Sequence, residues 1–465
     1  MLFLFCQNHN NKTLSSIPNI SHELEHRSIG KLLWHYSFPT IIGTLVNALY
    51  NIVDRIFIGQ GVGAYAISGL ALTFPIMMIL GAVGMLIGQG AATRISISLG
   101  KKDVESAKTI LCNAVILTLI ASGSIIVFTY IFLDEILVLF GGTDTIIPYA
   151  KEYMQIILLG HILTTFSFGF NNIMRASGYP IKAMCTMLIG ACLNVILDPI
   201  FIFVLDLGIK GAAISTVISM TVTSMWVLLH FMNKNHIVHF EKSGFHLQKH
   251  VVWAIIAIGF SPFCVQIATS LVNIFMNITL EKYGGELAIG AFGIITSFST
   301  LIIMAIVGLT NGMQPIIGYN YGAQQNKRVR ETLRYVIIVA LALTTIGCLC
   351  AQIFPDSIAS FFTSDETLIK ITAHGIHLSL MMFFMVGFQL VVTSFFQSIG
   401  KVNTSILLSI TRQILFLFPL LWLFPNIWGL DGAWAAHSIA DLLSAIVAGI
   451  ALTLQIKKLK SIQCE

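Results

Sequence analysis

The chain has 465 residues, of which 56% are hydrophobic and only 10% are charged. Soluble domains carry about 25% charged residues, so this composition argues against a soluble or disordered protein. The apolar runs are continuous rather than alternating, which argues against a membrane β-barrel and favours spanning helices.

Twelve apolar segments follow one another along the chain, and each is long enough to cross a hydrocarbon core of ~30 Å. They cover residues 33–57, 66–98, 108–132, 147–174, 180–205, 210–232, 251–280, 288–319, 333–354, 368–397, 402–424 and 432–455. The residues before them, 1–30, are mostly polar and are expected to form a flexible cytoplasmic tail. We therefore predict an all-α integral membrane protein with twelve transmembrane helices.

The distribution of Lys and Arg predicts the orientation of these helices. Of the 26 such residues, 20 fall on the side of the N-terminus and five on the opposite side, while Arg412 lies inside a helix. Because Lys and Arg concentrate in cytoplasmic loops, both termini are expected in the cytoplasm. The short loops suit a bacterial cytoplasmic (inner) membrane. The basic loops follow the membrane surface, which argues against a nucleic-acid partner.

The chain also repeats itself with a shift of 222 residues, which becomes 221 near the end of each half. The segment Gly90–Leu111, which ends LGKKDVESAKTIL, matches Gly312–Leu333, which ends YGAQQNKRVRETL. Each half holds six helices, so both halves enter the membrane from the same side and should be related by a pseudo-two-fold axis along the membrane normal. The predicted organisation is an N-terminal six-helix lobe (31–235), a cytoplasmic linker (236–250) and a C-terminal six-helix lobe (251–465).

Ionisable side chains are costly inside a membrane, and when present they usually serve a function. Three acidic residues within the predicted helices are the main candidates for a functional role: Asp54, Asp198 and Asp441. The first two are expected at similar height in the N-terminal lobe. The alternatives are that Asp54, next to Arg55, lies at the membrane interface, and that Asp198 is structural.

The surroundings of Asp198 are rich in oxygen atoms. Asn194 lies one turn earlier on the same helix face,. Pro199 has no N–H, so it frees the carbonyl of residue 195 from its helical hydrogen bond. Together with Asp54, these groups could hold Na⁺, or could carry protons if burial brings the two carboxyl groups together.

A second group of ionisable residues is predicted in the C-terminal lobe. Arg412 and Asp441 both fall near the membrane midplane on sequential helices, and His437 lies one turn from Asp441. We favour a structural ion pair, with a proton-relay or substrate role as the alternative.

No motif for another chemistry is present. The chain contains no GxxxxGK[ST], HExxH or CxxC sequence, so neither ATP nor a resident metal or other cofactor is expected,. An integral membrane enzyme would need a catalytic cluster, and no nucleophile accompanies His437 and Asp441. We therefore expect a protein that is not an enzyme.

These features resemble the multidrug and toxic compound extrusion (MATE) family over about residues 30–456. The segments that carry the resemblance are YNIVDRIFIG (50–59), RASGYP (175–180), NVILDPIFIF (194–203), LGIKGAAIST (207–216) and HSIADLLSAI (437–446). The resemblance implies a V-shaped protein with two six-helix lobes. It also implies an antiporter that exports bulky, often cationic or amphipathic drugs by alternating access, driven by H⁺ or Na⁺, and acting as a monomer.

The resemblance also implies which residues couple transport to the cation. By similarity these are Asp54, Asn194, Asp198 and Thr216, with the backbone carbonyl of Ala212.

Two further positions, Asn171 and Asn51, match polar positions of the substrate cavity. Another branch of the family places acidic ligands on helices 7 and 10, where this chain offers Gln266 and Gln389 instead. We therefore expect coupling in the N-terminal lobe. The alternative function is a flippase for lipid-linked saccharides, from the same wider superfamily, although such proteins usually carry more basic residues in the cavity.

Overall fold

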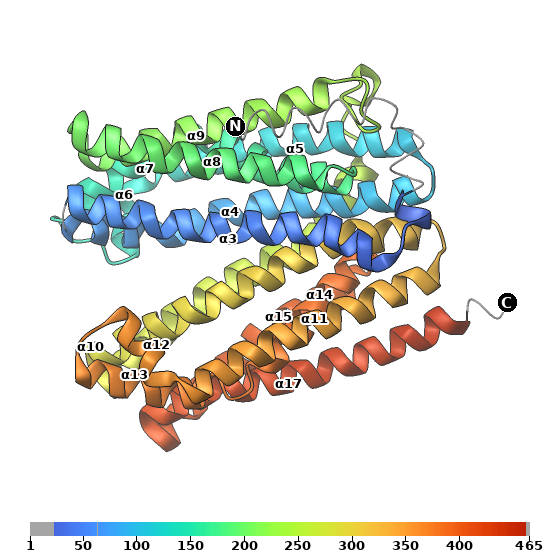
Figure 1. Cartoon of the computed structure of the whole chain (residues 1–465). Helices are drawn as coiled ribbons and strands as arrows, with labels where there is room; N and C mark the ends of the chain where they lie inside the picture. Colours follow the sequence, from blue (N-terminus) through green and yellow to red (C-terminus); the bar gives the residue numbers. More distant parts are fainter. Residues whose placement is uncertain (1–22, 63, 462–465) are drawn as a thin grey trace.

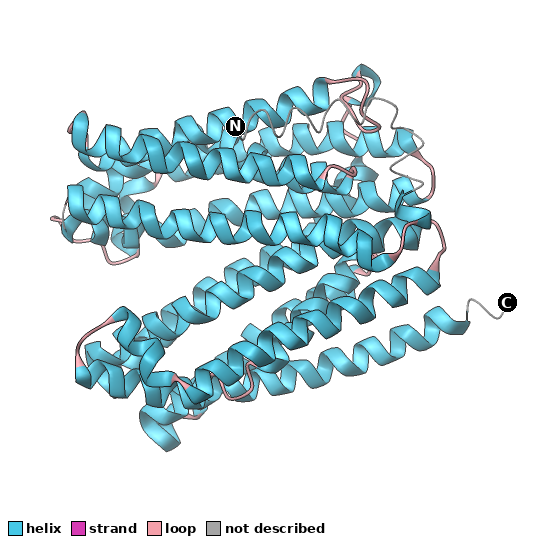
Figure 2. Ribbon diagram, viewed as in Figure 1, coloured by secondary structure: helices cyan, strands magenta, loops and turns pink. Residues whose placement is uncertain are grey.

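The computed structural model describes residues 23–62 and 64–461, apart from the side chains of residues 51, 55, 59, 64–67, 71 and 459–461. In this part of the chain the secondary structure is helical, and loops join the helices (Figure 2). The bounds of the helices follow the apolar segments of the sequence closely.

The N-terminal lobe is built from six long helices. They are α3 (Ile29–Gly61), α4 (Ala64–Gly100), α5 (Val104–Ile131), α7 (Ile147–Ala176), α8 (Pro180–Pro199), which continues into the π-helical turn η1 (Ile200–Val204), and α9 (Gly208–Met232). The short helix α6 (Leu133–Leu139) joins α5 to α7. A loop that contains the 3₁₀ turn η2 (Lys242–Gly244) leads to the second lobe.

The C-terminal lobe begins with α10 (Lys249–Gly322), which has 74 residues. It continues with α11 (Asn326–Ile353), α12 (Pro355–Phe362), α13 (Glu366–Ser379), α14 (Phe384–Ser398), α15 (Val402–Ile410), the π-helical turn η3 (Thr411–Leu417), α16 (Phe418–Leu423) and α17 (Pro425–Ser461). An unbroken helix of 74 residues would be about 110 Å long, far more than a membrane core requires. The chain avoids this length because Gly285 takes φ 68° and ψ −167°, which breaks α10 into two helices,.

The number of spanning helices agrees with the prediction of twelve. Within residues 23–62 and 64–461, ten helices are long and apolar enough to cross a membrane, and α13 with α14 form an eleventh, bent by 54°. The two parts of α10 account for the twelfth. The protein is therefore a multi-pass membrane protein of two six-helix lobes.

The bend between α13 and α14 differs from the single helix predicted over residues 368–397. The backbone carbonyls at the bend accept hydrogen bonds from the neighbouring helix α11: Thr344 donates to Phe384 at 2.9 Å, and Cys348 Sγ lies 3.2 Å from the carbonyl oxygen of Leu380. These partners compensate for the missing helical hydrogen bonds. Since they come from another part of the chain, the local sequence gave no sign of the bend.

The two lobes converge at one end and splay apart at the other (Figure 1). We call the converging end the linker side, because it carries the 233–248 loop, the start of α3 and the end of α17. The splayed end carries α6, α12 and α13. The lobes thus form the V-shaped arrangement that the resemblance implied.

Glycine allows the backbones of the two lobes to touch on the linker side. A Cβ atom at Gly90 would lie 3.2 Å from the backbone nitrogen of Gly259, and one at Gly312 would lie 2.7 Å from that of Ser37. These two contacts are equivalent under the 222-residue shift. Gln89 donates to Asn311, which is 222 residues away, at 3.1 Å. Equivalent residues that touch must lie beside the pseudo-two-fold axis.

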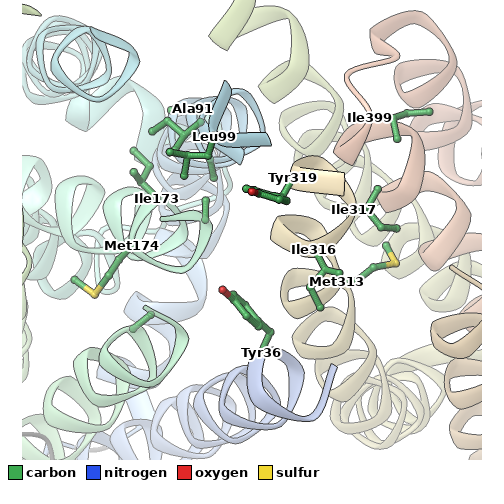
Figure 3. Close-up of a cluster of buried hydrophobic side chains, with 14 of the residues drawn as sticks. Tyr36, Ala91, Leu99, Ile173, Met174, Met313, Ile316, Ile317, Tyr319 and Ile399 are labelled. Atoms are coloured by element: carbon green, nitrogen blue, oxygen red, sulfur yellow. The ribbon is translucent and has the colours of Figure 1, made fainter. Parts of the chain in front are cut away.

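Apolar side chains from both lobes fill the space around this axis. The cluster includes Tyr36 and Ile173 from the N-terminal lobe and Met313, Ile316 and Tyr319 from the C-terminal lobe (Figure 3). All five are buried. Their burial stabilises the closed arrangement of the linker side.

The prediction of a flexible tail was wrong for residues 23–28, which we call the N-terminal segment. Leu24 is buried, and the Arg328 guanidinium of the C-terminal lobe donates to the carbonyls of Leu24 at 3.0 Å and Arg27 at 2.7 Å. Asn320 accepts from the same guanidinium at 3.0 Å. The segment is therefore ordered against the other lobe. The rest of the predicted tail, up to residue 22, lies outside the described residues.

The predicted linker packs against the N-terminal lobe. Glu241 forms an ion pair with Lys108 of α5 at 2.9 Å, and the Lys108 ammonium lowers the pKa of the Glu241 carboxyl. Asn113 of α5 accepts a hydrogen bond from the backbone N–H of Gln248 at 2.8 Å. These contacts hold the linker to α5.

Candidate functional site

Three helices of the N-terminal lobe bring the predicted coupling residues together. Asp54 comes from α3, Asn194 and Asp198 from α8, and Thr216 from α9. Asp198 is fully buried and Asn194 is 2% exposed. The carboxyl groups of Asp54 and Asp198 are in hydrogen-bond contact across the interface between α3 and α8. We call these residues, together with Ser215, the N-lobe cluster.

Asn194 connects α8 to α9. Its amide nitrogen lies 3.2 Å from Oδ1 of Asp198, 3.2 Å from Oγ1 of Thr216 and 3.4 Å from Oγ of Ser215. An amide nitrogen has two protons to donate. Asn194 therefore orders the acceptors on both helices around one point.

Two oxygen atoms of the cluster lack a donor. In the part of the chain that the structure describes, Oδ1 of Asn194 and Oδ2 of Asp198 are buried and accept no hydrogen bond from an N–H or hydroxyl group. Such atoms are rare in folded proteins because their desolvation is not compensated. A proton or a metal cation would compensate for it, so this donor set fits either ion.

The local structure of α8 follows from Pro199. Proline lacks an N–H and cannot continue the hydrogen-bond ladder, and η1 begins directly after it with the bond from Leu205 N–H to Ile200 O at 2.9 Å. Short π-helical turns are frequent at functional sites. Gly61 of α3 leaves room for this turn, since a Cβ there would lie 2.3 Å from the side chain of Ile202.

Ser215 belongs to the cluster although the sequence analysis did not select it. Its side chain is fully buried on α9, and its hydroxyl donates to Oδ1 of Asp198. Ser215 Oγ also lies 3.0 Å from the carbonyl oxygen of Ala212, which joins the cluster in this way. The i+3 spacing of Ala212 and Ser215 places both on one face of α9, but this spacing alone does not distinguish Ser215 from the other small polar residues of that helix,.

Of the two residues predicted in the substrate cavity, Asn171 does not join the cluster. Asn171 is buried near the linker side, where its amide donates to the carbonyl of Ala183 at 2.7 Å. Ala183 is 15 residues from Asp198 on α8, which corresponds to about 22 Å along the helix. The side chain of Asn51 lies outside the described residues.

The ion pair predicted in the C-terminal lobe is present. Arg412 Nε of η3 donates to Oδ1 of Asp441 of α17 at 2.5 Å, and the Asp441 side chain is 2% exposed. His437 lies one turn away, with its ring centroid 5.8 Å from that of Phe292. The guanidinium balances the carboxylate, so this group is compensated within the chain.

The C-terminal lobe has no acidic equivalent of the N-lobe cluster at the matching positions. The 222-residue shift carries Asp54 onto Met276 and Asp198 onto Leu420. Both side chains belong to an apolar cluster, in which Met276 is fully buried. The lobes therefore share a fold but not this chemistry.

Comparison with known proteins agrees with this architecture. The MatE family model matches the chain twice, over residues 39–200 and 262–423, which is one copy in each lobe. The multidrug export protein MepA of Staphylococcus haemolyticus is 29% identical over 428 residues, covering 91% of this chain and 93% of that protein. MepA of Staphylococcus aureus is 28% identical over the same shares.

Solved structures match over almost the whole chain. A MATE transporter crystallised with MaL6 has a TM-score of 0.89 and 26% identity, covering 94% of this chain and 99% of the other. An outward-facing multidrug resistance MATE transporter of the MOP superfamily also has a TM-score of 0.89 and 26% identity, covering 94% and 98%. Because the family model covers well over half of its length, the chain belongs to the MatE family, and it has the fold of the MATE transporters.

Proposed function

We propose that the chain is a cation-coupled antiporter that exports bulky, cationic or amphipathic drugs by alternating access. Its relatives are multidrug export proteins. The observation that carries the proposal is the contact between two carboxyl groups, Asp54 and Asp198, beside two buried oxygens that have no donor. In a membrane interior, such groups require a positive charge.

H⁺ and Na⁺ both suit this site. A proton held between two carboxyl groups removes their mutual repulsion, as in paired carboxylates elsewhere. Na⁺ would bind the free oxygens of Asn194 and Asp198, since hard cations prefer oxygen ligands. In either case the ion is a co-substrate that enters and leaves during the cycle.

The proposed transport step begins at the N-lobe cluster. In the outward-open form a cation reaches Asp54 and Asp198 and neutralises them, which allows α3 to bend or repack against α8. This movement lowers the affinity of the space between the lobes for the drug, which leaves to the outside. The lobes then rock, the linker side opens, and the cation is released into the cell.

The proposal includes an orientation in the membrane. The linker side faces the cytoplasm of a bacterial cell, with both termini inside, because Lys and Arg concentrate there,. The splayed end then opens to the outside. One chain contains both lobes and the complete N-lobe cluster, so the protein acts as a monomer.

Ethidium efflux tests the function. Cells that lack their own pumps would express the wild type, Asp198→Asn, or Asp356→Asn as a matched control, since Asp356 is exposed on α12. The pH and Na⁺ gradients would be collapsed separately. We expect efflux by the wild type and the control, loss of efflux in Asp198→Asn, and arrest when one of the two gradients is removed.

Full efflux by Asp198→Asn at normal expression would refute the site. Absence of efflux of ethidium and other cationic dyes by a well-expressed wild type would refute drug export. That second result would favour the flippase for lipid-linked saccharides.

A further inference from the structure

Ser215 has one hydroxyl proton and two acceptors within reach. The hydroxyl donates to Oδ1 of Asp198, and Ser215 Oγ lies 3.0 Å from the carbonyl oxygen of Ala212. A hydroxyl can donate one strong hydrogen bond at a time. The side chain is fully buried, so water does not offer a third choice.

The charge of Asp198 decides between these acceptors. A hydrogen bond to an ionised carboxylate is roughly twice as strong as one to a neutral carbonyl. While Asp198 is ionised and no cation is bound, the Ser215 hydroxyl therefore donates its hydrogen bond to this carboxylate. Once a cation neutralises Asp198, the carbonyl of Ala212 becomes the better acceptor. The lone pairs of Ser215 then face the cation.

We propose that Ser215 is a positioning residue of the cation site, donating to Asp198 when the site is empty and to Ala212 when the site is occupied. This inference rests on the proposed function, because it assumes that a cation binds at Asp198. A proton on Asp198 has the same effect, since a protonated carboxyl becomes a donor to Ser215 Oγ and reverses the bond.

The switch reaches the backbone of α9. A serine hydroxyl that donates to a carbonyl of its own helix one turn earlier tends to bend that helix. Occupation of the site therefore adds a back-bond at Ala212 and changes the curvature of α9. The neighbours that face Asp198 are consistent with this role: among the described side chains the titratable one is Asp54 of α3, while Ser215 and Thr216 of α9 are neutral.

The proposal predicts a change in the selectivity of the site between the two ions. In Ser215→Ala the empty, ionised site loses its donor, which favours protonation. This loss favours binding of either cation to the same extent, but the Na⁺-bound site also loses an oxygen ligand, so Na⁺ binding weakens relative to proton binding. A hydrogen bond to a charged group contributes about tenfold or more to affinity.

The test measures binding of ²²Na⁺ to the purified full chain as a function of pH. The plateau of the apparent Kd at high pH reports Na⁺ binding, and the pH at which the Kd begins to rise reports proton competition. For Ser215→Ala we expect proton competition to begin about one pH unit higher, without the tenfold fall in plateau Kd that loss of the donor alone would give. Ser215→Thr, which retains the hydroxyl, should restore the onset of proton competition toward that of the wild type.

The matched control is Ser224→Ala, another buried serine of α9, which donates to the carbonyl of Leu163 at 2.5 Å outside the cluster. It should bind both ions like the wild type. An unchanged Ser215→Ala curve, or proton competition that begins at lower pH than in the wild type, would overturn the proposal. Normal Na⁺ binding by Asp198→Asn would refute the proposed cation site. If Asp198→Asn lost Na⁺ binding while Ser215→Ala bound both ions like the wild type, only the role of Ser215 would be refuted.

Discussion

A close approach of the two lobes predicts that Gly100→Ala shifts the protein away from the conformation described here. A Cβ atom at Gly100 would lie 2.0 Å from the carbonyl oxygen of Tyr319 and 3.0 Å from the backbone nitrogen of Ala323. Both are backbone atoms, which cannot rotate away. The helices α4 and α10 would have to separate by about 1 Å on the linker side to reach an ordinary contact distance.

The size of the effect follows from the cost of overpacking. Inserting a methyl group into a well-packed contact costs about 1–3 kcal/mol. If the linker side opens during transport, this cost applies only to the closed form. The ratio of open to closed molecules should then rise by roughly 5–150-fold.

Spin labels at positions 101 and 327 can measure this shift. Lys101 and Lys327 are exposed beside the linker-side ends of α4 and α11, one in each lobe. In nanodiscs, Gly100→Ala should add a population at longer distance. The matched control is Gly81→Ala on the same helix, where an added Cβ has no atom within 4 Å. A distance distribution for Gly100→Ala identical to that of Gly81→Ala would refute the argument.

Three further predictions concern other parts of the structure. Asp441→Asn leaves the charge of Arg412 without its partner and should destabilise the protein by about 3–5 kcal/mol, measured as a lower melting temperature. Replacing both residues with apolar ones should restore the melting temperature. Burial and the nearby Lys182 lower the pKa of His236 to about 4. Because His236 in the unfolded chain binds a proton at higher pH than in the folded chain, the melting temperature should fall as pH drops from 6.5 toward 4. The melting temperature of His236→Gln should fall less over the same range. Arg328→Ala should increase hydrogen exchange in the N-terminal segment but not in the linker, and equal exchange in wild type and variant would contradict the role of that guanidinium.

The helices and their pairing could be predicted because their signals are local or repeated. Apolar runs fixed the spans to within a few residues, and the 222-residue shift identified equivalent positions such as Gly90 and Gly312 before any contact was known. Glycine at equivalent positions of the two halves then explains how closely the lobes approach. Fold class and lobe organisation therefore required no information beyond composition and periodicity.

Two features could not be predicted from the sequence because their causes lie elsewhere in the chain. The bend after Ser379 has no proline or glycine at the break, and depends on Thr344 and Cys348 of α11. Ser215 is one of many small polar residues on α9, and only the position of Asp198 distinguishes it. Single-helix patterns cannot report contacts between helices, so such residues appear only in the assembled structure.

The two lobes show how a duplicated fold can be specialised. The 221-residue shift carries Thr216 of the N-lobe cluster onto His437, one turn from the pair of Arg412 with Asp441. In the C-terminal lobe a guanidinium already supplies the positive charge that the carboxylate needs. In the N-terminal lobe no such side chain faces Asp198 among the described residues, and the free oxygens there require an ion from solution. A charge that is fixed to the chain cannot be exchanged across a membrane, whereas a mobile one can. This asymmetry is why we place coupling in the N-terminal lobe.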